Sequence, residues 1–200
     1  MLKLELIRGD NYDEEYLELP ATPADVGEVM ARLDETCKDA ASTRIYGAIS
    51  DVWNIGQYLK HADVNDPVQL KKLNRIAELT RGLSRDENLI FQGGLDSKSI
   101  NGLDDVIDVG EHLDRYLLVR HVTSDKELGI CLVSCGIKPF DESVQPYLDY
   151  SRIGIEYYAN HGGAYTSGGY VLRRDSAEQA LRDIVDARNN RQTFGAMRMG

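Results

Sequence analysis

The sequence predicts an α+β fold that is elongated and built from two to three small domains in series. Three observations predict it: strand-like stretches near the start, helical periodicity from Pro67 onward, and a glycine-containing hairpin pattern close to the end. The expected units are a mixed α/β domain at 1–64, a mainly helical domain at 65–138, and an α+β domain with a frayed tail at 139–200. An apolar content of 42% supplies core side chains for each unit.

The first domain is expected to open with a strand, followed by an exposed acidic loop. A helix should come next, because Thr22 is a suitable N-cap and Pro23 suits the first helical position. Its apolar positions repeat at helical spacing: Val26, Val29, Met30 and Leu33. The β-branched and aromatic stretch at 42–50 predicts a strand, and 52–62 predicts a short amphipathic helix.

The central domain is expected to be helical. Helices are predicted over 68–83, 84–95, 100–119 and 124–136. The first of them has an apolar face made of Leu70, Leu73, Ile76, Ala77 and Leu79. Ser84 and Ser124 are expected N-caps, Glu127 occupies the capping-box position after Ser124, and Gly136 should end its helix.

The last domain is expected to begin after Pro139. A helix at 147–163 should end at a glycine pair, and 164–173 should form a hairpin with its turn at Gly168 and Gly169. Ser176 is the expected cap of a final helix at 176–190, and 192–200 is expected to be a frayed tail.

Composition narrows the class of protein. The start of the chain lacks the pattern of a signal peptide, and no stretch is apolar enough to span a membrane, so a cytoplasmic location is expected. The net charge of -10 disfavours direct binding to nucleic acid or an anionic membrane and favours a basic partner. We expect no cofactor or metal, because Cys131 and Cys135 have no paired histidine ligands nearby and are better explained as buried free thiols.

Nothing in the sequence indicates an enzyme. No G-x-S-x-G is present, and the glycine-rich GGAYTSGG lacks the Gly-Lys-Ser/Thr ending of a phosphate-binding loop. Adjacent carboxylates such as Asp104 and Asp105 point about 100° apart on a helix, which is poor geometry for a shared ion. We therefore expect a binding protein without a catalytic residue.

The most informative feature is a row of acids in the helix expected around 101–115. Leu103, Val106, Ile107, Gly110 and Leu113 form one face, and the acids Asp104, Asp108, Glu111 and Asp114 form another. At about 1.5 Å per residue, four carboxylates over ten residues span roughly 15 Å. The carboxylates are therefore about 5 Å apart along the helix, a spacing similar to that of DNA phosphates, which follow each other about every 3.4 Å along one strand. An ordinary solvated helix face is the alternative explanation.

Further acids are candidates for extending this row. Residues 1–40 carry eleven acids and four bases, and Asp13, Glu14 and Glu15 crowd together after the expected first strand. A second group follows the central domain and consists of Asp141, Glu142, Asp149 and Glu156. From 161 onward six bases outnumber four acids, so the last helix is not expected to face a basic partner.

Several segments, taken in order, resemble the divergent clostridial-type branch of the ArdA antirestriction proteins. They are LPATPADVGEVMARL, KLNRIAELTRGLSRDE, GLDDVIDVGEHLDRYLLV, KELGICLVSCG and YLDYSRIGIEYYANHGGAYTSGGYV. The resemblance covers most of 18–171 and consists of helical phrases, with no catalytic motif. It implies a protein of a phage or conjugative element that imitates bent duplex DNA as a homodimer of three-domain subunits. Such a protein occupies the DNA-binding groove of a host type I restriction-modification enzyme and needs no cofactor.

Two other functions remain open from the sequence. An anti-CRISPR inhibitor would use the same array of carboxylates in the DNA channel of a CRISPR effector. An adaptor of a mobile element would instead bind a partner through apolar surface, with acids that only keep it in solution. Binding by DNA mimicry should weaken steeply with salt, whereas binding by an adaptor should barely change.

Overall fold

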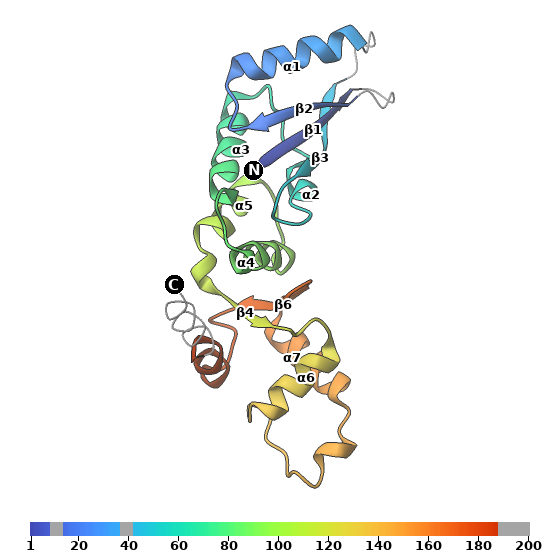
Figure 1. Ribbon diagram of the computed structural model, residues 1–200, viewed down its shortest axis with the longest axis vertical. Helices are drawn as coiled ribbons and strands as arrows, with labels where there is room; N and C mark the ends of the chain where they lie inside the picture. Colours follow the sequence, from blue (N-terminus) through green and yellow to red (C-terminus); the bar gives the residue numbers. More distant parts are fainter. Residues whose placement is uncertain (9–13, 37–41, 188–200) are drawn as a thin grey trace, which may run out of the picture.

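The computed structural model describes residues 1–8, 14–36 and 42–187. The described chain is mixed α/β, with two three-stranded antiparallel sheets and helices packed on them (Figure 1). This confirms the expected mixture of helices and small sheets. The predicted acid Asp13 and the predicted tail at 192–200 lie outside the described residues.

The first sheet holds the strands of the amino-terminal unit in the order β2-β1-β3. Its strands are β1 (Leu2–Arg8), β2 (Glu14–Leu19) and β3 (Thr43–Ile49). Alternate side chains of β1, including Leu2, Leu4 and Leu6, are fully buried, as the two-residue period of a strand requires. Helix α1 (Pro23–Thr36) contacts β2, and its start at Pro23 is as predicted.

Three longer helices follow the short helix α2 (Gly56–Leu59): α3 (Pro67–Thr80), α4 (Arg85–Asp96) and α5 (Leu103–Glu111). The predicted apolar face of α3 is confirmed, with Leu79 only partly buried and the other four positions buried. Asp66 caps α3 by accepting a hydrogen bond from Val68 N at 2.8 Å. Ser84 and Glu87 form a complete capping box at the start of α4, which fixes this helix boundary.

A strand interrupts the helical run that the sequence predicts up to residue 119. After α5 and the 3₁₀ helix η1 (Leu113–Arg115), the chain forms β4 (Tyr116–Arg120). The prediction of a helix there was wrong. β4 is buried on both faces, so its apolar residues follow one another without the alternation that marks a half-buried strand. The second sheet has the order β4-β6-β5 and includes the predicted hairpin β5 (Ala164–Thr166) and β6 (Gly169–Arg173).

Helices α6 (Asp125–Ser134) and α7 (Tyr150–His161) pack together in the last part of the described chain, with the 3₁₀ helix η2 (Gln145–Tyr147) between them in sequence. Ser124 caps α6 as predicted, but Glu127 bonds to Thr123 N at 2.7 Å, one residue before the cap. Gly136 has a φ of 72° and ends α6, as predicted. The final helix covers 179–187 of the described residues and does not begin at Ser176, so the predicted cap was wrong.

The buried side chains form two clusters on opposite faces of the second sheet, because β4 and β6 contribute alternate residues to each cluster. The first runs from Leu2 to Leu118 and includes Val171, and the second runs from Leu117 to Val185. The domain boundaries at 64/65 and 138/139 stay predictions. Gly93 of α4 faces Val171 so closely that an added Cβ would lie 2.4 Å from the valine Cβ. This glycine lets α4 pack directly against the second sheet.

Candidate partner-binding surface

The row of acids lies on α5, whose opposite face is anchored in the first core cluster. Leu103, Val106 and Val109 are buried. Gly110 packs near Phe91, since an added Cβ would come within 2.8 Å of that ring. The predicted apolar face is therefore largely confirmed, and it fixes the outward direction of the acids.

Basic residues of neighbouring elements pair with three of the four predicted acids. Lys72 Nζ of α3 lies 2.7 Å from Asp104 Oδ2, although the Asp104 side chain is 78% exposed. One turn further along α3, Arg75 donates to Glu111 Oε1 at 2.9 Å. The acidic row is consequently matched by a basic row on α3 that sequence analysis missed.

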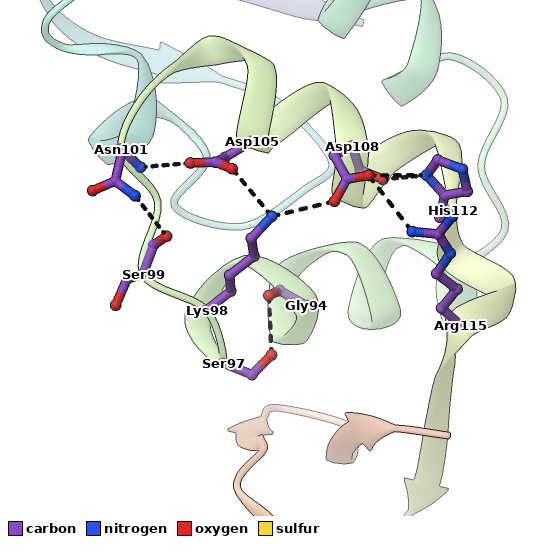
Figure 2. A network of polar contacts seen from close by, with 9 residues as sticks. All are labelled: Gly94, Ser97, Lys98, Ser99, Asn101, Asp105, Asp108, His112 and Arg115. Carbon is purple, nitrogen blue, oxygen red and sulfur yellow. Dashed lines mark hydrogen bonds and ion pairs between the residues drawn. The ribbon is translucent and has the colours of Figure 1, made fainter. Parts of the chain in front are cut away.

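Asp108 belongs to a larger network that also involves Asp105 (Figure 2). Lys98 Nζ, from the turn after α4, lies 3.1 Å from Asp105 Oδ1 and 3.2 Å from Asp108 Oδ2. On its other side Asp108 Oδ1 lies 3.3 Å from His112 Nδ1 and 3.6 Å from Arg115 Nη1. The carboxylate of Asp108 is thus held among three nitrogen-bearing side chains.

The pKa shifts follow these contacts. The hydrogen bond from Lys98 lowers the pKa of Asp108, against the opposing effect of burial. The pKa of Asp105 is lowered first by a hydrogen bond from the backbone N–H of Asn101 and then by Lys98. Hydrogen bonds to Glu111 and Glu78 raise the pKa of Arg75. The contacts with Lys98 and Asn101 thus favour the ionised forms of Asp105 and Asp108.

The last predicted acid of the row, Asp114, lies beyond α5 in η1. It is exposed and makes no ion pair with a described residue. Its charge acts at longer range on Arg174, which is itself paired with Asp186 at 2.9 Å. Asp114 therefore lies outside the helix that carries the other three acids and lacks the basic partner that each of them has.

The amino-terminal acids form a separate surface on β2 and α1. Glu14 is exposed and accepts a hydrogen bond from Tyr16 Oη at 3.0 Å, while Glu15 pairs with Arg32 at 2.9 Å. A hollow of about 360 Å³ lies between the strand and the helix, and its carboxylates come from Glu18, Asp25 and Glu28. Glu28 was missed by the sequence analysis, because its place opposite Glu18 depends on how α1 packs against β2.

The third group of acids lies around the segment between α6 and α7. Asp141 and Glu142 are exposed there, and Glu156 is exposed on α7. Asp149 caps α7 by accepting a hydrogen bond from Arg152 N at 3.1 Å. Within the described part of the chain, none of these four carboxylates is ion-paired. In Figure 1 this segment is drawn at the bottom, α5 near the middle and α1 at the top.

The cysteines and histidines considered as possible ligands in the sequence make contacts within the fold. Cys131 on α6 and Cys135 directly after this helix are partly buried, with their Sγ atoms 4.0 Å apart, so the prediction that they are buried was only partly right. Within 1–8, 14–36 and 42–187 no three His, Cys, Asp or Glu side chains gather as a metal site. His161 stacks on Tyr157 with ring centroids 4.1 Å apart.

Comparison with known proteins adds no relative: no protein-family model and no curated protein matches the chain. None of the helices in the described residues is long and apolar enough to cross a membrane.

Proposed function

We propose that this chain is a DNA-mimicking antirestriction protein that occupies the DNA-binding groove of a host type I restriction-modification enzyme. It acts in the bacterial cytoplasm, without catalysis or a cofactor and without binding nucleic acid itself. The observation that carries the proposal is the row of carboxylates Asp104, Asp108 and Glu111 on α5, because the opposite face of this helix is buried and neighbouring bases hold the acids in place. The resemblance to ArdA proteins supports the same function.

The ion pairs within the row are compatible with this function. Exposed pairs contribute only about 0.2–1 kcal/mol each, so an incoming Lys or Arg of the target can replace Lys72 or Arg75 at small cost. Phosphates of DNA are also accompanied by cations, which a protein releases when it binds. The internal bases hold the carboxylates in position before binding, which reduces the entropy lost on association.

We also propose that the molecule is elongated, with its units in series, and that it forms a homodimer. The elongated shape is supported by the order of elements in Figure 1, which runs from α1 through α5 and α4 to α6 and α7. It is also supported by the two core clusters, which lie on opposite faces of the second sheet. Such a shape offers acids of β2, α5 and the segment after α6 to one long groove. Small-angle X-ray scattering would measure both the length and the number of subunits.

A second candidate function is an adaptor that binds through apolar surface. One observation favours it: Phe140, Val144 and Tyr147 are exposed in the segment between α6 and α7, and Tyr147 reaches 86%. Exposed aromatic side chains are frequent anchors of protein interfaces. The adaptor predicts binding that resists salt and depends on Tyr147, whereas DNA mimicry predicts binding that weakens with salt and depends on α5.

The test compares two triple variants that each remove three carboxylates. The first is Asp104→Asn, Asp108→Asn and Glu111→Gln on α5. The control removes three acids of the carboxyl-terminal part, in the substitutions Asp175→Asn, Asp183→Asn and Asp186→Asn. Both variants lose three negative charges, and two of the control acids are also ion-paired, with Arg173 and Arg174.

Inhibition of DNA cleavage by a type I enzyme is then measured for both variants. We expect the α5 variant to lose most of its inhibition and the control to keep it. Equal inhibition by the two folded variants would contradict the assignment of the α5 surface. If the unchanged protein leaves the type I enzyme active but blocks a CRISPR effector, the mechanism stands and the target is wrong.

A further inference from the structure

A groove runs along the first half of α4, away from the acidic row. It consists of two adjoining hollows. One, of about 450 Å³, is lined at one side by Trp53, and the other, of about 350 Å³, is lined by Arg120 and His121. The residues that line both hollows are Arg85, Leu89 and Ser167. Volumes of this size are usual for sites that bind small molecules.

The charge of this groove, hereafter the α4 groove, is unusual for a chain with a net charge of -10. Its two acids are occupied, since Asp86 pairs with Arg120 and Asp51 lies 3.5 Å from the amino group of Met1. Arg85 is exposed and makes no ion pair within the described part of the chain. The guanidinium of Arg85 and the imidazole of His121 are therefore available to an anion.

The aromatic and polar lining adds a second kind of contact. Trp53 is the only tryptophan of the chain, and 74% of its surface is exposed. An indole left in water loses hydrophobic stabilisation unless a partner covers it, and its flat face suits stacking against another ring. Asn88, in the same hollow, has a buried Oδ1 without a hydrogen-bond donor.

Two turns with left-handed backbone lie beside the α4 groove. Among described residues other than glycine, only Asn54 and His121 have positive φ angles, of 60° and 63°. Asn54 directly follows Trp53, and His121 lines the opposite hollow. Asparagine and histidine adopt left-handed backbone more readily than most residues, and here they mark the turns that carry Trp53 and the imidazole of His121.

We propose that the α4 groove binds a nucleoside monophosphate. The base stacks on Trp53 and the phosphate contacts Arg85 and His121, because this ligand class joins a flat ring that carries hydrogen-bond donors to an anion. The site is separate from the carboxylates of α5, so it is independent of the proposed inhibition of restriction.

The single tryptophan makes the test direct. AMP is titrated into the full-length protein while the fluorescence of Trp53 is followed, with adenosine and inorganic phosphate as separate probes. We expect a saturable change with AMP and weaker responses to either fragment. Arg85→Ala should weaken AMP binding roughly tenfold or more, as loss of a charged hydrogen bond to phosphate requires.

The matched control is Arg81→Ala, which removes an exposed arginine that lies outside the groove, four residues earlier. It should bind AMP like the unchanged protein. The proposal is overturned if AMP gives no saturable change at millimolar concentration, if adenosine binds as tightly as AMP, or if Arg85→Ala and Arg81→Ala behave alike. Calorimetry on Trp53→Ala, in which fluorescence is lost, should show weakened AMP binding as well.

Discussion

Removing the bases that cover the acidic row should make the protein a stronger inhibitor. In the variant Lys72→Gln with Arg75→Gln, the carboxylates of Asp104 and Glu111 lose partners at 2.7 and 2.9 Å. The side chains are partly exposed, so the folded state should lose only about 0.2–1 kcal/mol for each pair. Each freed carboxylate can then meet a base of the target, a contact worth about 1 kcal/mol at 4 Å in water-like surroundings.

The unchanged protein makes the same contacts only after breaking its internal pairs, so the variant gains the cost of those two pairs, about 0.4–2 kcal/mol in total, or roughly a two- to thirtyfold gain in affinity. The assay is the concentration of protein that halves DNA cleavage by a type I restriction enzyme, together with a urea titration that measures folding stability. A matched control is Lys71→Gln with Arg81→Gln, which removes two exposed bases of the same region that do not contact α5 acids. Unchanged or weaker inhibition by the Lys72 and Arg75 variant would refute the idea that these carboxylates contact the target.

Two predictions concern folding. Gly93→Ala should destabilise the protein by about 1–3 kcal/mol, because its Cβ would lie 2.4 Å from Val171, whereas Gly27→Ala, with open space around it, should stabilise by about 0.5–1 kcal/mol. Equal urea midpoints for the two variants would contradict this account of the α4 packing. The pKa of Asp108 is lowered in the folded state by Lys98, so its contribution to stability is present above the ordinary carboxyl pKa and is lost as the pH falls through the folded value. Lys98→Met should therefore destabilise the protein at pH 6 and have a smaller effect in strong acid. Urea midpoints of the variant and the unchanged protein are measured at both pH values. The same difference between the two proteins at both pH values would contradict this reasoning.

Several helix ends could be predicted from the sequence, because the residues that fix them act locally. The caps at Thr22 and Ser84 act over three residues, and α1 and α4 begin where these residues place them. Gly136 ends α6 for an equally local reason, since its φ of 72° suits glycine. Ser176 was misassigned because the sequence SAEQ also matches a helix start, while the structure uses a turn there.

Strand β4 was missed because its partner is distant in the sequence. Tyr116 pairs with Arg173 and Arg120 pairs with Gly169, so the strand depends on a hairpin about fifty residues later. Its run of apolar residues is equally compatible with a buried helix when periodicity alone is considered. Local patterns cannot decide such a case.

The candidate surface was predicted in part. The face of α5 that carries Asp104, Asp108 and Glu111 followed from helical spacing, and the structure places these acids on one side of α5. The bases that pair with them were missed, because Lys72 and Arg75 lie more than thirty residues away and reach the row only through the packing of α3 on α5. Lys72 and Arg75 are three residues apart, so they share one face of α3, which is the signal that could have indicated a matching basic row.

The most direct test of DNA mimicry is competition for the DNA-binding groove. The protein is titrated into a type I restriction enzyme bound to labelled duplex DNA, at a low and a high salt concentration, and release of the DNA is followed by fluorescence anisotropy. The account predicts stoichiometric release at low salt that fades at high salt, because the carboxylates compete with phosphates for the same Lys and Arg side chains. Enzyme that keeps its DNA at low salt in the presence of excess protein would contradict it.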